Sequence, residues 1–198
     1  MKKYLFRLGK QAVKAAIETI NSKRKNKVLK DYCNLLKKYK IKIISENKKD
    51  LKLAKQKKLK DNLLNRLLVN EKKILEIIKS INNIIKLKDP VNQTLEKWKR
   101  PNGLKISKVT TSIGVISIIY ESRPNVTSDV ASLCFKSGNP VILKGGSEAY
   151  YTNKILSNLF RKALKKNNIN LNYVQFIDYK NKKVVDFLLT KMSDYIDV

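Results

Sequence analysis

The feature that most constrains the fold is an alternation of apolar runs and helical segments that begins at Gly114. The run Gly114–Tyr120 is apolar on both faces and rich in β-branched residues, and Pro140–Lys144 is a second run of this kind. A helical segment, Val126–Ser137, separates them and ends at Gly138, a residue type suited to a helix C-terminus. Strands that are apolar on both faces are typical of a parallel sheet covered by helices. The pattern therefore predicts a doubly wound, Rossmann-like α/β sheet.

The same alternation continues toward the end of the chain. The segment Gly145–Glu148 opens a helix that is expected to reach about Lys166, and Tyr173–Ile177 is a third apolar run. A further helix is expected over Lys182–Thr190, and Tyr195–Val198 has the pattern of the start of a fourth strand. Because that strand stops before its following loop, we expect a truncated sheet with an unpaired edge.

The earlier part of the chain follows other patterns. Residues 1–90 are predicted to be helical, because apolar residues recur at spacings of three and four. Two alternating runs, Leu95–Trp98 and Lys105–Val109, flank a Pro-Asn-Gly turn and predict a β-hairpin. The expected organisation is a helical region over 1–90, a hairpin lead-in over 91–112 and an incomplete α/β domain over 113–198.

The helical region carries three apolar stripes, which cover Leu5–Thr19, Val28–Tyr39 and Ile74–Ile85. Asn70 is placed to cap the third helix, and Asp89-Pro90 is expected to end it. Stripes of this kind are more often core than binding site, so we assign them no function.

The formal net charge of +28 suggests a nucleic-acid partner. Only six of the 44 basic residues are arginines, however, and arginine is the residue that favours bidentate recognition of phosphates and bases. Basic residues also concentrate in 21–60 and are sparse in 111–147. We therefore interpret the charge as a solvated lysine surface and expect no specific nucleic-acid partner. A lysine-rich polynucleotide-binding protein remains an alternative.

The cysteines do not indicate a metal or redox site. Cys33 and Cys134 lie in amphipathic helical stretches and are interpreted as small buried hydrophobic residues. The sequence has no histidine and no C-x-x-C pair, so we expect neither a metal centre nor a disulfide. No run of about 18 apolar residues occurs, and we expect no membrane span and a cytoplasmic location.

The loop after the second buried run carries candidate ligand-binding residues. In an open parallel sheet, ligands bind beyond the carboxyl ends of the strands. Gly145 and Gly146 would let the backbone approach a ligand, and Ser147 would cap the following helix, whose free N–H groups attract an anion. Lys144 adds a cation, and Glu148 can accept hydrogen bonds from ribose hydroxyls. The loop suits phosphate and ribose, but an ordinary strand-to-helix turn is the alternative.

The loop after the first run, Glu121–Thr127, reaches the same edge of the sheet. Arg123-Pro124 favours extended backbone, and Asn125 lies at the start of a helix. Either Asn125 merely caps that helix, or its amide points into the cleft and donates to a developing oxyanion.

Read together, the two loops resemble a known family. The stretch IGVISIIYESRPNVTSDVASLCFKSGNPVILKGGSEA, residues 113–149, closely resembles the cofactor-domain core of glutamate-5-semialdehyde dehydrogenase, also called gamma-glutamyl phosphate reductase. That family belongs to the aldehyde dehydrogenase superfamily. The resemblance extends over essentially all 198 residues and is most specific in YESRPNVT and SGNPVILKGGSEA.

The resemblance implies a reaction and a cofactor. The family reduces L-glutamyl 5-phosphate to L-glutamate 5-semialdehyde with NADPH, in proline biosynthesis, through a thioester on a cysteine. Residues 113–198 would then be an incomplete NADP-binding domain. Full-length relatives are expected to be homo-oligomers.

The resemblance also implies roles for individual residues. Asn125 would be the oxyanion donor. Lys144 and Glu148 would hold the adenosine ribose, and Lys144 would suit a 2′-phosphate and so favour NADP. The remaining cofactor-binding residues would be Gly145, Gly146, Ser147, Ser122, Arg123 and Pro124, the last three near the nicotinamide half.

The chain departs from the family in one large respect. The family's nucleophilic cysteine and its glycine-rich cofactor loop lie beyond the point where this sequence stops, and neither Cys33 nor Cys134 matches that cysteine. We therefore expect this polypeptide alone to be inactive. The alternative is a non-catalytic NADP-binding or interaction fragment.

Overall fold

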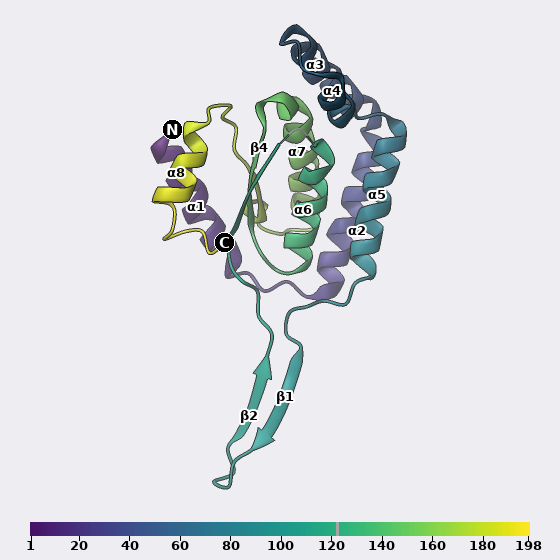
Figure 1. Ribbon diagram of the computed structural model, residues 1–198. Helices are drawn as coiled ribbons and strands as arrows, with labels where there is room; N and C mark the ends of the chain where they lie inside the picture. Colours follow the sequence, from purple (N-terminus) through teal and green to yellow (C-terminus); the bar gives the residue numbers. More distant parts are fainter. Residues whose placement is uncertain (122) are drawn as a thin grey trace.

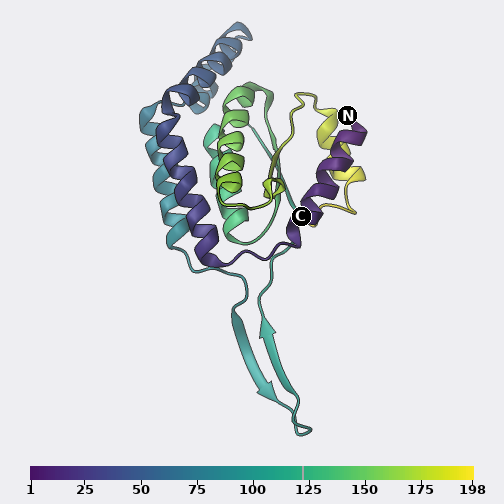
Figure 2. The same ribbon diagram turned by 180° about the vertical axis from the view of Figure 1, so that it is seen from behind.

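A computed structural model describes residues 1–121 and 123–198; Ser122, one of the predicted cleft residues, lies outside the described residues. Figure 1 shows a small central sheet with helices on both sides and a long hairpin that extends away from it. Figure 2, the view from behind, again places α1 and α8 on the opposite side of the sheet from α6 and α7. The predicted doubly wound α/β architecture is confirmed.

The chain alternates between helices and strands from β3 onward. The helices are α1 (Lys2–Ala16), α2 (Ser22–Lys38), α3 (Lys40–Gln56), α4 (Asp61–Leu67), α5 (Glu71–Lys86), α6 (Pro124–Lys136), α7 (Tyr150–Lys166) and α8 (Lys183–Lys191), with short 3₁₀ turns η1 (Ser147–Ala149) and η2 (Leu171–Tyr173). The strands are β1 (Thr94–Lys99), β2 (Lys105–Val109), β3 (Ile116–Tyr120), β4 (Val141–Gly145) and β5 (Val174–Phe176).

Strand β4 is the centre of the parallel sheet and is buried over its whole length. Its side chains alternate between two cores, as the pleat of a strand requires. Val141 and Leu143 belong to the core shared with α2, α5, α6 and α7, whereas Ile142 belongs to the core shared with α1 and α8. Because helices of residues 1–90 contribute to both cores, the sheet depends on them for its burial; the boundaries at 90 and 112 remain a prediction.

Strand β3 is less buried than its sequence predicts. We expected Gly114–Tyr120 to be covered on both faces, but Ile119 is 43% exposed. Strand β3 is an edge strand of the three-stranded sheet. The Ser117 amide donates to the Val198 carbonyl at 2.7 Å, and the Asp197 amide donates to the Val115 carbonyl at 2.8 Å. The expected fourth strand is thus present only as this short backbone pairing.

The apolar stripes of the sequence do not predict where helices α3 and α4 begin and end. Helix α3 buries Asn47 and Asp50, which are each 1% exposed, together with few apolar side chains. Asn47 receives a hydrogen bond from the Val69 amide at 2.9 Å and donates to the Leu67 carbonyl at 2.9 Å. A helix whose buried face is polar carries a weak periodic signal, because hydropathy alone cannot distinguish a buried asparagine from an exposed one.

Most predicted ends of the regular elements lie close to the observed ones. Asn70 caps α5 by accepting from the Lys73 amide at 2.9 Å. Gly138 adopts φ +74° after α6, and Gly103 adopts φ +87° in the hairpin turn, the left-handed region that glycine enters most easily. Helix α5 ends at Lys86, earlier than Asp89-Pro90 predicts.

Two lysines, Lys25 and Lys136, are buried and are exceptions to the predicted solvated lysine surface. Lys25 is 2% exposed and pairs with Asp89 at 3.0 Å, so this lysine is part of the packed interior. Lys136 is 3% exposed and donates to the Asn26 side chain at 2.7 Å. Lys25 ties α2 to the segment after α5, and Lys136 ties α6 to α2, so neither is available to a polyanion.

The cysteines are as predicted: Cys33 and Cys134 are free and buried, and burial raises the pKa of each thiol to about 11. None of the helices in the described residues is long and apolar enough to cross a membrane. Among those residues, no group of three or more acidic, histidine or cysteine side chains is arranged to hold a metal ion.

A pH-dependent contact ties α2 to the end of α7. Asp31 is 8% exposed and accepts from Lys166 Nζ at 2.6 Å and from Asn167 Nδ2 at 2.8 Å. Burial alone would raise the pKa of Asp31, but these two hydrogen bonds lower it below its ordinary value of 3.8. A lowered pKa means that the stabilisation is present above about pH 4 and is lost as the pH falls through the folded-state pKa.

We therefore predict that Asp31→Asn lowers the free energy of unfolding by about 1–2 kcal/mol at pH 6 and by less at pH 3. Urea unfolding at the two pH values measures this. The control is Glu76→Gln, which breaks an exposed pair with Lys73 and should cost under about 0.5 kcal/mol at either pH. A pH-independent cost of Asp31→Asn would contradict the assignment.

Candidate nucleotide-binding cleft

The loop after β4 opens into a cleft of about 510 Å³ at the carboxyl ends of β3 and β4. All five predicted residues of that loop line it. The cleft is completed by Ile119, Tyr120 and Glu121 at the end of β3, by Leu59 and Leu63 before and within α4, and by Lys180, Lys182, Val185 and Asp186 around the start of α8. The position is the one at which open parallel sheets bind ligands.

Lys144 is the buried cation of the cleft. It is 6% exposed, and its ammonium donates to the Gly145 carbonyl at 2.9 Å. Burial lowers the pKa of Lys144, while the nearby Glu148 raises it. An ammonium has three N–H donors, and the described residues give Lys144 no further acceptor. The two remaining donors can therefore hold an anion or a hydroxyl oxygen of a ligand.

Glu148 supplies acceptor oxygens on the opposite side of the loop. Burial would raise the pKa of Glu148, but a hydrogen bond from Ser147, its own backbone amide and the nearby Lys57 and Lys144 together lower it. The Ser147 hydroxyl donates to Glu148 Oε1 at 2.7 Å. The carboxylate is thus ionised near neutral pH and can accept from hydroxyl groups.

The expectation that Ser147 caps the next helix is wrong. Ser147 lies in η1, and α7 begins at Tyr150 without a side-chain cap from the loop. Asp50 of α3 fills that place instead: its carboxylate accepts from the amides of Tyr151 at 3.0 Å and Thr152 at 2.8 Å. These amides are not free for a phosphate, because α3 folds across the helix N-terminus.

The protein's own packing leaves no room for a side chain at Gly145 and limited room at Gly146. A Cβ on Gly145 would lie 2.3 Å from Asn153 Nδ2 and 3.1 Å from the Tyr120 ring. A Cβ on Gly146 would lie 2.9 Å from Glu148 Oε2 and 3.4 Å from the backbone of Glu121. The two loops are therefore in close contact, and the glycine pair serves loop-to-loop packing as well as any ligand.

A buried polar chain fixes this contact. Tyr120 Oη and Thr127 Oγ1 lie 2.7 Å apart, and the Thr127 hydroxyl donates to Asn153 Oδ1 at 2.9 Å. Burial raises the pKa of Tyr120, so the phenol stays protonated. These hydrogen bonds join the end of β3, the first turns of α6 and the first turns of α7, and so hold the walls of the cleft in fixed positions relative to one another.

Two predicted residues of the first loop, Arg123 and Asn125, line a different cavity. Helix α6 begins at Pro124, with Arg123 in the N-cap position, so Asn125 is a helical residue and not the cap. Its side-chain amide donates to Asp129 Oδ2 at 3.2 Å. Arg123 and Asn125 line a basic cavity of about 410 Å³ between α6 and the α4–α5 region.

The structure thus divides the predicted site. The loop Lys144–Glu148 lines the nucleotide cleft, whereas Arg123 and Asn125 face the neighbouring basic cavity, which Arg66 and Lys73 also line. Pro124 is buried in the first turn of α6. Sequence reasoning missed the lysines around the start of α8 and the basic residues of α4 and α5, because no motif distinguishes them from the many other lysines of the chain.

Comparison with solved structures identifies the fold. A probable aldehyde dehydrogenase from Listeria monocytogenes superimposes with a TM-score of 0.70 at 14% identity, over 94% of this chain and 39% of that one. At this identity the likeness concerns the fold alone. The fold is that of part of an aldehyde dehydrogenase-like enzyme.

A nearer likeness identifies the family. A gamma-glutamyl phosphate reductase from Thermotoga maritima superimposes with a TM-score of 0.93 at 36% identity, covering 97% of this chain and 47% of that one. A gamma-glutamyl phosphate reductase from Dictyoglomus thermophilum is 44% identical over 182 residues, or 92% of this chain and 44% of the relative. No protein-family model matches the sequence. The chain is a homologue of the gamma-glutamyl phosphate reductases, and it spans about half the length of the curated relatives it matches.

The close contact at Gly145 gives a test of the cleft geometry. We predict that Gly145→Ala lowers the free energy of unfolding by about 1–3 kcal/mol, because the new methyl group overlaps Asn153 Nδ2. In an Asn153→Ala background the same substitution should cost at least about 1 kcal/mol less. A double-mutant cycle by denaturant unfolding measures the coupling; additive effects would show that Asn153 is not the neighbour that excludes a side chain.

Proposed function

We propose that this chain supplies the cofactor-binding segment of a gamma-glutamyl phosphate reductase. The reaction is the NADPH-dependent reduction of L-glutamyl 5-phosphate to L-glutamate 5-semialdehyde in proline biosynthesis. The observation that carries the proposal is the buried Lys144, with two donors left over, beside the ionised Glu148 at the carboxyl ends of parallel strands. Homology to reductases of that name supports the choice of reaction.

The residues of the cleft fit a nicotinamide dinucleotide. Lys144 and Glu148 are a donor and an acceptor suited to the hydroxyl groups of an adenosine ribose. A 2′-phosphate on that ribose would gain from Lys144 and from Lys180 and Lys182, which line the same cleft. Three acidic side chains, Glu121, Glu148 and Asp186, line the same cleft, so the preference for NADP over NAD rests on the unused donors of the buried Lys144. When bound, the cofactor supplies the hydride.

The neighbouring basic cavity fits the phosphorylated substrate. Arg66, Lys73 and Arg123 surround it with positive charge, as a carboxylate and an acyl phosphate require. Asn125 reaches the same space. Its amide nitrogen has two N–H donors, and Asp129 uses one of them, so the other can donate to a developing oxyanion.

The cysteines of this chain do not suit covalent catalysis. A nucleophilic cysteine needs a lowered pKa and access to substrate, whereas Cys33 and Cys134 are buried with thiol pKa values of about 11. Neither lines the cleft or the basic cavity. The roles we propose for this segment are therefore binding, orientation and stabilisation of charge, and the purified chain should show no reductase turnover.

The proposal predicts a cofactor preference that depends on Lys144. We expect Lys144→Met, which keeps most of the side-chain volume, to weaken NADPH binding by about tenfold to a hundredfold, in line with loss of a charge-assisted contact. NADH, which lacks the 2′-phosphate, should lose less. Fluorescence titration of both dinucleotides measures the two dissociation constants.

The matched control is Lys162→Met. Lys162 lies outside the cleft and pairs with the Tyr39 hydroxyl at 2.7 Å, so its loss should leave both affinities unchanged. Thermal unfolding of each variant checks that the fold is intact. Equal losses of NADPH and NADH binding would rule out a 2′-phosphate role for Lys144, and unchanged binding of both would remove the cleft as the cofactor site.

A further inference from the structure

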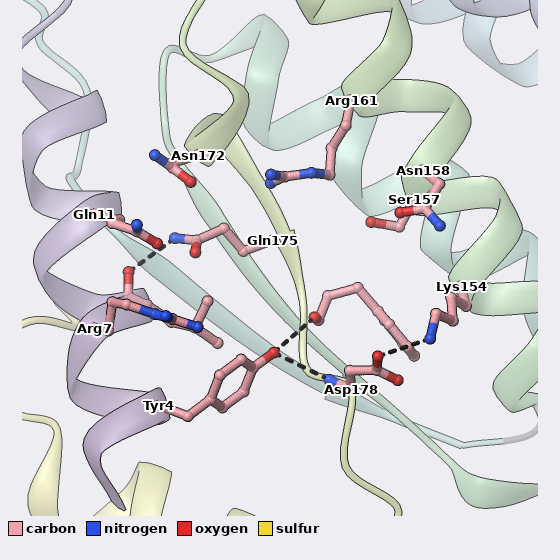
Figure 3. A pocket seen from close by; sticks show the side chains of 12 residues that line it. Tyr4, Arg7, Gln11, Lys154, Ser157, Asn158, Arg161, Asn172, Gln175 and Asp178 are labelled. Atoms are coloured by element: carbon pink, nitrogen blue, oxygen red, sulfur yellow. Dashed lines mark hydrogen bonds and ion pairs between the residues drawn. The ribbon is translucent and has the colours of Figure 1, made fainter. Parts of the chain in front are cut away.

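A third polar cavity lies away from the nucleotide cleft, between α1 and α7 and beside β5 (Figure 3). Its volume is about 270 Å³, and no residue of the loop Lys144–Glu148 lines it. Two of the chain's six arginines, Arg7 and Arg161, do. The basic cavity around Asn125 also has two arginines, Arg66 and Arg123, so the arginine pair alone does not define this cavity; its other polar groups do.

Arg161 lines the cavity and has guanidinium donors left over for a ligand. Its Nη1 group donates to the carbonyls of Leu171 at 2.7 Å and Val174 at 2.8 Å, which uses both hydrogens of that nitrogen. The Nε and Nη2 hydrogens have no acceptor among the described residues. Nε and Nη2 form one edge of the planar guanidinium, and such an edge matches the two oxygens of a carboxylate.

Arg7 adds a second positive charge from the opposite wall. Its guanidinium carbon lies 5.7 Å from the centre of the Tyr4 ring, a cation–π contact that orients the side chain. The Tyr4 hydroxyl in turn donates to the Phe176 carbonyl at 3.4 Å. Figure 3 shows Arg7 and Arg161 entering the cavity from α1 and α7. Neither arginine has a carboxylate within 4.0 Å in the part of the chain that the structure describes.

Two residues that line the cavity each carry a buried oxygen that has no hydrogen-bond partner among the described residues. Gln175 is 2% exposed; its Nε2 donates to the Leu8 carbonyl at 2.8 Å, while its Oε1 has no hydrogen-bond partner among the described residues. Ser157 is 1% exposed, and its Oγ is likewise unpaired. A buried acceptor without a partner costs about 1–3 kcal/mol, so a ligand that donates a hydrogen bond to Gln175 would relieve a real penalty.

The carboxylate that lines the cavity, Asp178, has its negative charge balanced by an ion pair within the protein. It pairs with Lys154 at 2.7 Å and also accepts a hydrogen bond from the Tyr150 hydroxyl. The two arginines therefore leave the cavity with an excess of positive charge. The cavity thus offers positive charge, a pair of guanidinium donors and an unpaired acceptor. These groups suit a ligand that has both a negative charge and a hydrogen-bond donor.

We propose that this cavity binds a small carboxylate that carries a hydrogen-bond donor on the adjacent carbon, an α-hydroxy or α-amino acid. The carboxylate lies on the Nε–Nη2 edge of Arg161, with Arg7 contributing charge. The adjacent hydroxyl or ammonium group donates to Gln175 Oε1. A cavity of about 270 Å³ is too small for a dinucleotide, so this site is separate from the cofactor cleft.

The test uses glycolate, glycine, acetate and inorganic phosphate as probes at constant ionic strength, with affinities from isothermal titration calorimetry on the full chain. We expect saturable binding of glycolate and glycine. Acetate, which lacks the donor, should bind about five- to tenfold more weakly, the loss expected for one hydrogen bond to a buried acceptor. Tighter binding of phosphate than of both donor-bearing carboxylates, or equal binding of glycolate and acetate, would overturn the proposal.

Matched arginine variants locate the site. Arg7→Gln changes an exposed side chain and should weaken glycolate at least fivefold, whereas Arg100→Gln, which changes an exposed arginine in the turn between β1 and β2, should leave it unchanged. Both variants should retain wild-type NADPH affinity, which separates this site from the proposed cofactor function. Glycolate affinity that survives Arg7→Gln, or that falls equally in both variants, would contradict the assignment.

Discussion

The burial of β4 on both faces is the constraint on which the rest of the structure depends. A strand in that position needs a neighbour on each edge and a helical layer on each face. Strands β3 and β5 supply the edges, while α6 and α7 cover one face and α1 and α8 the other. The same constraint delivers Lys144 to the carboxyl end of the sheet with its stem buried and its ammonium at the cleft. The chemistry of the site is thus a consequence of where the strand ends.

One of the protein's own carboxylates occupies a place where the phosphate of a ligand could otherwise bind. The amides at the start of α7 would suit a phosphate, but Asp50 of α3 binds them, and Asn47 of the same helix holds the segment before α5 in place. Helix α3 is therefore an internal brace. The donors that remain for a ligand in the nucleotide cleft therefore come from lysine side chains, Lys144 above all, and not from the amides of Tyr151 and Thr152 at the start of α7.

The sequence predicts the parts of this molecule that depend on local periodicity. Apolar runs and glycine positions locate β3, β4 and α6, and the Lys144–Glu148 loop lies at the predicted end of the sheet. The division of the site into a nucleotide cleft and a separate basic cavity around Asn125 could not be predicted. It depends on where α4, α5 and α8 pack, which no spacing within the two loops encodes. The buried polar face of α3 could not be predicted for the same reason, because Asn47 and Asp50 are buried by contacts with residues far away in the sequence.

A crystal structure of the chain with NADP tests the central claim most directly. The account predicts that the dinucleotide occupies the cleft at the carboxyl ends of β3 and β4, with Lys144 Nζ at hydrogen-bond distance from the adenosine ribose or its 2′-phosphate and with Asp50 still bound to the start of α7. A dinucleotide found in the basic cavity around Asn125, or one whose phosphates displace Asp50 from the α7 amides while Lys144 stays uncontacted, would contradict it.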